Sequence, residues 1–198
     1  MRSVESYSYE ASHYISTEEA KIHLKVDGDE DEAYITTLVK AAFKIASDYV
    51  GYEIRKAKVN YTFENLDYRS RLRIPARIIS VVHSKYYDEN AAEQTLTVAT
   101  SPNTYSTYGY DLYVTLAPSS VNSYGDKYKI QVYEGFEPST SGVTESHTTF
   151  PESIRHAIYF ILGNLYDNRQ DYVIGATNVE LPMNSKFLLN PYKIMKFV

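Results

Sequence analysis

Residues 14–27 have the sequence YISTEEAKIHLKVD, which contains the strongest local signal in the chain. Ser16 and Glu19 have the spacing of a capping box, in which the serine side chain accepts from the amide three residues on and the glutamate accepts from the serine amide. Ile15 stands where a hydrophobic staple needs an apolar residue. The stretch therefore predicts a short helix that begins after Ser16 and ends near Leu24.

A longer helix is predicted directly after this one. The acid-rich turn at residues 27–31 leads into apolar residues that recur at steps of three and four between Ile35 and Tyr49. That spacing is typical of one buried helix face. Acids at the start suit the helix dipole, and Gly51 is suited to the position after the last turn. We expect a helix over residues 31–50.

A third helix is predicted to start at Pro151, because proline has no amide to leave unsatisfied at the first helical position. An apolar stripe runs from Ile154 to Tyr166, so the helix is expected to reach about Asn168. Neither this stripe nor that of residues 31–50 can be buried alone. The two helices are therefore expected to pack against each other as a core.

Between these helices the apolar period changes from 3.6 to 2, as Val59, Tyr61 and Phe63 alternate with polar residues. This alternation is typical of half-buried strands. Further strands are predicted at residues 78–87, 94–98, 110–116 and 128–133. Residues 57–135 are therefore interpreted as a small antiparallel β-unit, followed by a polar loop at residues 137–149.

The predicted fold class is α+β, with a small helical bundle, a long antiparallel β-rich insertion and an extended C-terminal arm. The predicted divisions are an N-terminal extension (1–13), a helical part (14–56), the β-rich insertion with its loop (57–149), a second helical part (150–170) and the arm (171–198). The arm combines large apolar side chains with three lysines. It is interpreted as a segment for a partner's groove, and docking back on the chain's own helices is the alternative.

Composition excludes several classes of protein. The 198 residues are 43% hydrophobic and 23% charged, which excludes wholesale disorder. The chain has no cysteine, so disulfide frameworks, thiol catalysis and cysteine-based zinc sites are excluded. Its longest apolar run, residues 157–162, is far shorter than a membrane span. No signal peptide is seen, so we expect a soluble protein that acts or assembles inside a cell.

Charge is unevenly distributed along the chain. Residues 1–32 hold nine acids and three bases, whereas residues 55–77 hold seven bases and two acids. This segregation suits a head-to-tail oligomer in which unlike ends meet, although charge runs are usually solvated faces. The residues proposed for such subunit interfaces are Asp29, Asp31, Arg69, Arg71 and Arg73. The arginines alternate as in a strand, and a charged edge that prevents aggregation is the alternative.

No catalytic, cofactor or metal site is predicted. Asp27, Asp29 and Asp31 fit the first half of a calcium loop, but Glu32 and Leu38 occupy its required glycine and glutamate positions. The five histidines include no metal-binding pair at a spacing of four. Glu152 and His156 lie one helical turn apart, a pair that is common on helix surfaces. With a pI of about 5.6, the chain also lacks the basic bias of a DNA-binding protein.

Taken in order, these elements resemble the head–tail connector (head-completion or adaptor) proteins of tailed bacteriophages. Three blocks carry the resemblance: residues 14–27 with the acids and helix that follow to Gly51, residues 151–158 with 165–169, and residues 188–192. Together they cover about half of the chain. Residues 1–13 and the tyrosine-rich insertion have no counterpart in this resemblance.

The resemblance implies a structural virion protein without enzymatic activity or a cofactor. It implies a ring, typically of twelve copies, that binds the portal at the capsid–tail junction, completes the DNA-filled head and provides a platform for the tail. The partners implied are the portal protein and the next tail or stopper component. Viral DNA passes through the channel during packaging and ejection without sequence-specific binding, and no membrane is involved. The subunit is expected in the host cytoplasm before assembly.

The C-terminal tail is the segment that the resemblance places on the portal. The residues expected to bind the portal are Leu188, Leu189, Pro191, Tyr192, Met195 and Phe197. A different class of function stays open: a binding module for a protein or glycan partner. Tyrosine makes up 21 of the 198 residues, and this alternative would use Tyr105, Tyr108, Tyr110 and Tyr113 as contacts.

Overall fold

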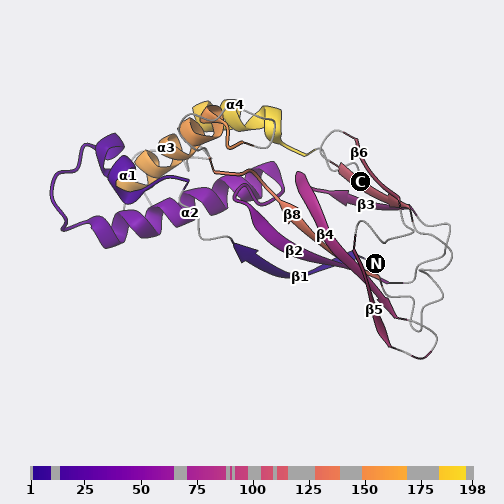
Figure 1. Ribbon diagram of the computed structural model, residues 1–198. Coiled ribbons are helices and arrows are strands. Elements are labelled where there is room, and N and C mark those ends of the chain that lie inside the picture. Colours follow the sequence, from indigo (N-terminus) through magenta and orange to yellow (C-terminus); the bar gives the residue numbers. More distant parts are fainter. Residues whose placement is uncertain are drawn as a thin grey trace. The chain divides into compact units, whose positions relative to one another are not determined.

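The chain forms two compact units, which alternate along the sequence (Figure 1). The β unit consists of residues 1–10, 56–136 and 196–198, and the helical unit of residues 11–55 and 137–195. The computed structural model describes residues 2–9, 14–64, 71–87, 90, 92–97, 104–108, 111–115, 128–138, 149–168 and 183–194. Within these ranges, no helix has both the length and the apolar character needed to cross a membrane.

The first helix of the helical unit, α1 (Thr17–Leu24), begins as predicted. The Ser16 hydroxyl accepts a hydrogen bond from the Glu19 amide at 3.1 Å, and the Glu19 carboxylate accepts one from the Ser16 amide at 2.8 Å. These two bonds satisfy donors that the helix itself leaves unpaired. The predicted capping box is therefore confirmed.

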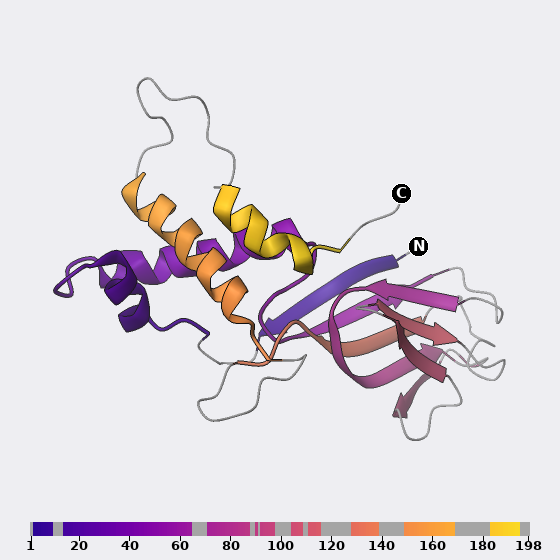
Figure 2. The ribbon, with the colours of Figure 1, turned by 90° about the horizontal axis from the view of Figure 1, so that it is seen from above.

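Helices α2 (Glu32–Val50) and α3 (Glu152–Asp167) form the core of the helical unit, as predicted (Figure 2). Gly51 ends α2 in the left-handed conformation, with a φ of 91°. Pro151 lies one residue earlier than predicted, at the cap position before the helix. The apolar residues that the two helices bury are Ile35, Leu38, Ala42, Phe43, Ala46, Val50, Ile154, Ala157, Ile158, Ile161 and Leu162.

The C-terminal region differs from the extended arm that the sequence predicted. Helix α4 (Met183–Leu189) packs on α3, and a 3₁₀ turn, η2 (Asn190–Tyr192), follows it. Leu189 is fully buried, and the amide of Ile194 donates a hydrogen bond of 2.9 Å to the carbonyl of Val50. The alternative, in which this segment docks on the chain's own helices, is correct for residues 183–194. The apolar side chains find a partner surface within the helical unit.

The β unit contains a five-stranded antiparallel sheet with the order β1-β2-β8-β4-β5. The strands are β1 (Arg2–Tyr9), β2 (Ala57–Phe63), β4 (Ile78–Tyr87), β5 (Glu93–Thr97) and β8 (Tyr128–Glu134). Val59, Tyr61 and Phe63 are buried on one face, as their alternation predicted. Two register shifts interrupt the pairing of β4 with β8, and β4 bends strongly in Figure 2.

A second sheet has the order β3-β7-β6, built from β3 (Arg71–Pro75), β7 (Asp111–Thr115) and β6 (Thr104–Tyr108). The fold class α+β is thus confirmed. Strands β1, β3 and β6 were not among the predicted strands. β1 is the clearest omission, because residues 2–9 pair with β2 through backbone hydrogen bonds along the edge of the sheet. Backbone pairing of this kind leaves a weak signal in the side-chain sequence.

Candidate assembly surfaces

One face of the five-stranded sheet carries lysines, opposite the face that is buried. The register places Lys58 beside Tyr133, and Lys85 beside Lys129. The ammonium groups of Lys56 and Lys58 lie 5.0 and 5.3 Å from the centroid of the Tyr133 ring, within cation–π range. We call this surface, with its four half-buried lysines, the lysine face.

His83 lies on the same face, where the register places it beside Gln131, and its pKa responds to the lysines. Burial lowers the pKa of His83 below its ordinary value, and repulsion by Lys85 and Lys58 lowers it further, while Glu93 opposes the shift. Glu93 accepts hydrogen bonds from Lys85 and, at 3.3 Å, from the hydroxyl of Tyr87. The bond from Lys85 holds the pKa of Glu93 below its usual range. A carboxylate is thus already bound on this face.

The acidic segment, residues 17–32, comprises α1 and the turn that follows it. Asp29 accepts a hydrogen bond of 2.7 Å from Lys21, which lowers the pKa of Asp29 and raises that of Lys21. Asp31 accepts one of 2.7 Å from the hydroxyl of Tyr166. Both carboxylates therefore have partners within the helical unit. In the described part of the chain, no three potential ligands among His, Cys, Asp and Glu gather as a metal site would need.

The predicted arginine cluster is only partly described. Arg73 is exposed in β3, between the buried side chains of Leu72 and Ile74. Arg71 belongs to the same strand, but its side chain lies outside the described residues, and so does all of Arg69. The arginines therefore stay a prediction as interface residues.

The tyrosines of the alternative binding face are described even less completely. Tyr113 is half-buried in β7. The side chains of Tyr105 and Tyr108, and all of Tyr110, lie outside the described residues.

Helix α4 has an exposed apolar face that sequence reasoning missed. Met183 and Phe187, one helical turn apart, are 86% and 76% exposed. The opposite face of the same helix buries Ser185 and Leu189. Both residues lie in the segment that was predicted to be an extended arm, so no helical spacing between them was predicted.

The expected portal contacts divide into three groups. Leu189 is buried within the helical unit and unavailable to a partner. Leu188 and Tyr192 are half-buried, the Tyr192 hydroxyl lying 2.8 Å from that of Ser153, and Pro191 is exposed. Met195 and Phe197 lie outside the described residues.

Arg155 on α3 holds the start of α1 in place. Its guanidinium donates to the carbonyl of Tyr14 at 2.8 Å and forms ion pairs with Glu152 at 3.3 Å and Glu19 at 3.6 Å. The guanidinium also lies 5.4 Å from the centre of the Phe150 ring. Glu152 is thus engaged by Arg155, in keeping with a structural role for this helix start.

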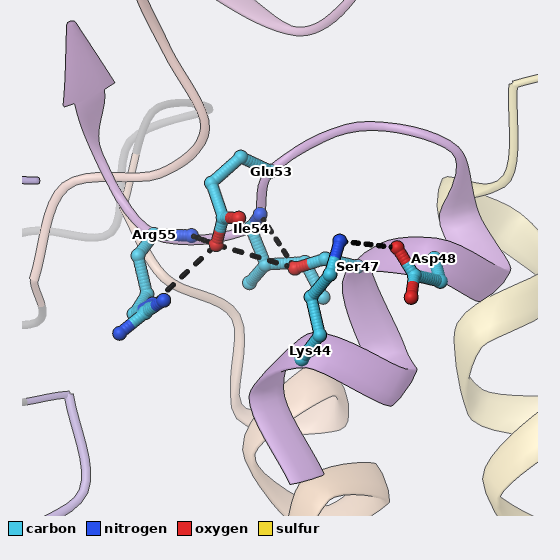
Figure 3. A network of polar contacts seen from close by, with 6 residues as sticks. All are labelled: Lys44, Ser47, Asp48, Glu53, Ile54 and Arg55. Atoms are coloured by element: carbon cyan, nitrogen blue, oxygen red, sulfur yellow. Dashed lines mark hydrogen bonds and ion pairs between the residues drawn. The ribbon is translucent and has the colours of Figure 1, made fainter. Parts of the chain in front are cut away.

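The segment after α2 is held by a buried polar network (Figure 3). Ser47 accepts a hydrogen bond from the Ile54 amide at 3.1 Å, and its hydroxyl lies 3.3 Å from the Glu53 carboxylate. Arg55 donates to the same carboxylate through its amide and its side chain, each at 3.4 Å. Figure 3 also shows the exposed pair Lys44–Asp48, which spans the turn of α2 that contains Ser47. The network fixes the path of the chain where α2 ends, and we assign it a structural role.

Comparison with solved structures shows that this fold occurs elsewhere. A chain described as belonging to the neck of an empty gene transfer agent (GTA) particle, computed with C6 symmetry, superposes with a TM-score of 0.73 at 13% identity. A chain from the virion of the native particle gives 0.71 at 13%, and a chain from the native neck computed with C12 symmetry gives 0.66 at 12%. Each match covers 98% of both chains, so the whole fold is shared. No protein-family model and no curated protein matches the chain.

Proposed function

We propose that this chain is a structural subunit of the neck of a phage-like particle, and more specifically a head–tail connector or adaptor. The observation that supports this most strongly is the full-length likeness to GTA neck chains, with a TM-score of 0.73 over 98% of both chains. The sequence blocks around residues 14–27 and 151–158 support the same proposal independently, because they resemble connector proteins.

In this proposal the chain forms a ring, of twelve copies, at the capsid–tail junction. The similar chains come from necks computed with C6 and C12 symmetry, which is compatible with a ring of twelve. The ring binds the portal, completes the DNA-filled head and presents a platform to the next tail or stopper component. It needs no cofactor or enzymatic activity, has no contact with a membrane, and assembles from subunits in the host cytoplasm.

The exposed face of α4 is our candidate for the portal contact. Met183 and Phe187 present large apolar side chains to solvent beside Pro191 and the half-buried Leu188 and Tyr192. Burial of such side chains against a partner lowers the free energy of the complex. We keep Met195 and Phe197 in the proposed contact and replace Leu189 by Met183 and Phe187.

Imaging of the purified protein, alone and mixed with its portal protein, tests this function. We expect closed rings that stack on the portal. The double variant Met183→Asp with Phe187→Asp should still fold but should no longer bind the portal. Phe160→Asp serves as the control, because Phe160 is an exposed apolar residue of α3, outside the proposed portal contact. A protein that stays monomeric with and without the portal would contradict the proposal, and glycan binding by that monomer would favour the alternative binding module.

A further inference from the structure

All of the chain's net negative charge resides in the acidic segment. Residues 17–32 contain seven acids and two lysines, which together give −5, and −5 is also the formal charge of the whole chain. The remaining residues hold eighteen acids and eighteen bases. The acidic residues of the segment that are exposed are Glu18, Glu19, Asp27, Asp29, Glu30 and Glu32. The helical unit thus presents a concentrated negative surface at one place.

The lysine face of the β unit is the oppositely charged counterpart. Four lysines from three strands or their ends gather there, and one of them, Lys85, binds the carboxylate of Glu93. Burial is the main cause of the lowered pKa of His83, and repulsion by Lys85 and Lys58 lowers it further, as expected beside a cluster of ammonium groups. Glu93 itself, held by Lys85 and Tyr87, shows how a carboxylate binds there.

We propose that the lysine face of one copy binds the acidic segment of the next copy, as a head-to-tail contact. This inference rests on the proposed ring. A closed ring with one kind of contact joins two different surfaces of the same chain, so each chain must carry both halves. The lysine face and the acidic segment meet that requirement, because they carry opposite charges on separate surfaces. Two lysine faces, or two acidic segments, would repel each other.

Nucleic acid is the rival occupant of a lysine-rich surface. A second copy is favoured because the face already holds a carboxylate through an ammonium and a phenol, and because the chain supplies six exposed carboxylates of its own. In the ring, the acidic segments would cover the lysines. DNA would then pass without being held by them.

Charge reversal tests the contact. Lys58→Glu with Lys129→Glu should weaken association at least tenfold, measured by analytical ultracentrifugation at fixed salt. Asp27→Lys with Glu30→Lys should weaken it similarly. Mixing the two variants should restore association, because the reversed lysine face can bind the reversed acidic segment while the two unchanged surfaces bind each other. Lys40→Glu with Lys44→Glu, on the exposed side of α2, is the control with the same change of charge as Lys58→Glu with Lys129→Glu and should assemble like the parent.

Because the chain has no cysteine, engineered cysteines give a second test that does not need complete rings. A mixture of Lys58→Cys and Glu30→Cys chains should form a disulfide-linked dimer faster than a mixture of Lys40→Cys and Glu30→Cys chains. Equal rates in the two mixtures would overturn the contact, as would a Lys58→Cys/Glu30→Cys double variant that closes the disulfide within one monomer. Loss of duplex-DNA binding, with unchanged assembly, in the Lys58→Glu/Lys129→Glu variant would assign the face to nucleic acid.

These outcomes separate the contact from the proposed function. Rings that bind the portal but ignore all the charge reversals would refute the contact and leave the connector function intact. Cross-linked dimers from a protein that never forms rings or binds a portal would support the contact and refute the connector function.

Discussion

At the residue scale, Arg155 shows how one side chain joins two helices. The side chain is 14% exposed and reaches a backbone carbonyl, two carboxylates and an aromatic ring. A largely buried donor with several partners contributes more than an exposed ion pair, because its partners lose their hydrogen bonds when it is removed.

Arg155→Met tests this difference. Methionine keeps much of the apolar stem but no donor, so the Tyr14 carbonyl loses its hydrogen bond and the free energy of unfolding should fall by about 2 kcal/mol. Urea unfolding measures the change. Lys44→Met is the control, since the Lys44–Asp48 pair is about two-thirds exposed and should cost less than about 0.5 kcal/mol. Equal losses for the two variants would contradict the role of Arg155.

His83 provides a test of the field on the lysine face. Its lowered pKa means that the neutral ring contributes stability above pH 6.5, the ordinary value, and that this contribution is lost as the pH falls through the folded pKa. Titration by NMR should place the pKa below 6.5. Lys85→Gln should move it back toward that value, whereas Lys40→Gln should leave it unchanged. A shift of the same size in both variants would show that the field is not local.

At the element scale, α2 and α3 are amphipathic helices that bury their stripes against each other. Ile161 is 2% exposed, while its neighbour Phe160 is 42% exposed. Ile161→Asp should cost about 4 kcal/mol, because it places a charge in the apolar core without a partner. Phe160→Asp, the matched control, should cost far less. Thermal unfolding of both variants measures the difference, and similar melting temperatures would show that the packing is assigned wrongly.

Helix α4 and the turn after it are part of the helical unit. Deletion of residues 190–198 removes the Tyr49–Asn190 bond of 2.6 Å, the Ser153–Tyr192 bond of 2.8 Å and the bond from Ile194 to Val50. It also removes the buried side chain of Ile194. We expect a loss of about 3 kcal/mol, or about 6–12 °C in melting temperature. A truncated protein that melts like the parent would indicate a free arm after all.

At the scale of the whole molecule, charge governs how an assembled ring treats DNA. Twelve copies at −5 each carry a formal charge of −60. A protein binds duplex DNA when its exposed lysines and arginines displace counterions from the phosphates. A ring whose lysines are covered has few such cations exposed. The assembled protein should therefore show no saturable binding to duplex DNA at micromolar concentration and 150 mM salt, measured by fluorescence anisotropy. Nanomolar binding under these conditions would contradict the proposed channel.

The amino-acid sequence by itself determined the features that depend on near neighbours. The capping box of Ser16 and Glu19, the stop at Gly51, the stripes of α2 and α3, and the alternation in β2 each arise from contacts a few residues apart. The direction of side chains along a helix or strand repeats regularly, so these patterns can be recognised without knowing the fold.

Only the tertiary structure decided the features that join distant residues. The lysine face combines Lys58, Lys85 and Lys129, which lie on three strands and become neighbours only through the register of the sheet. Whether the C-terminal segment folds back depends on whether the rest of the helical unit can bury Leu189 and Ile194, and this cannot be judged from the sequence of the segment itself. Edge pairing of β1 depends on backbone groups that all sequences share. These interactions join residues that are far apart in the sequence, so they can be identified only in the folded chain.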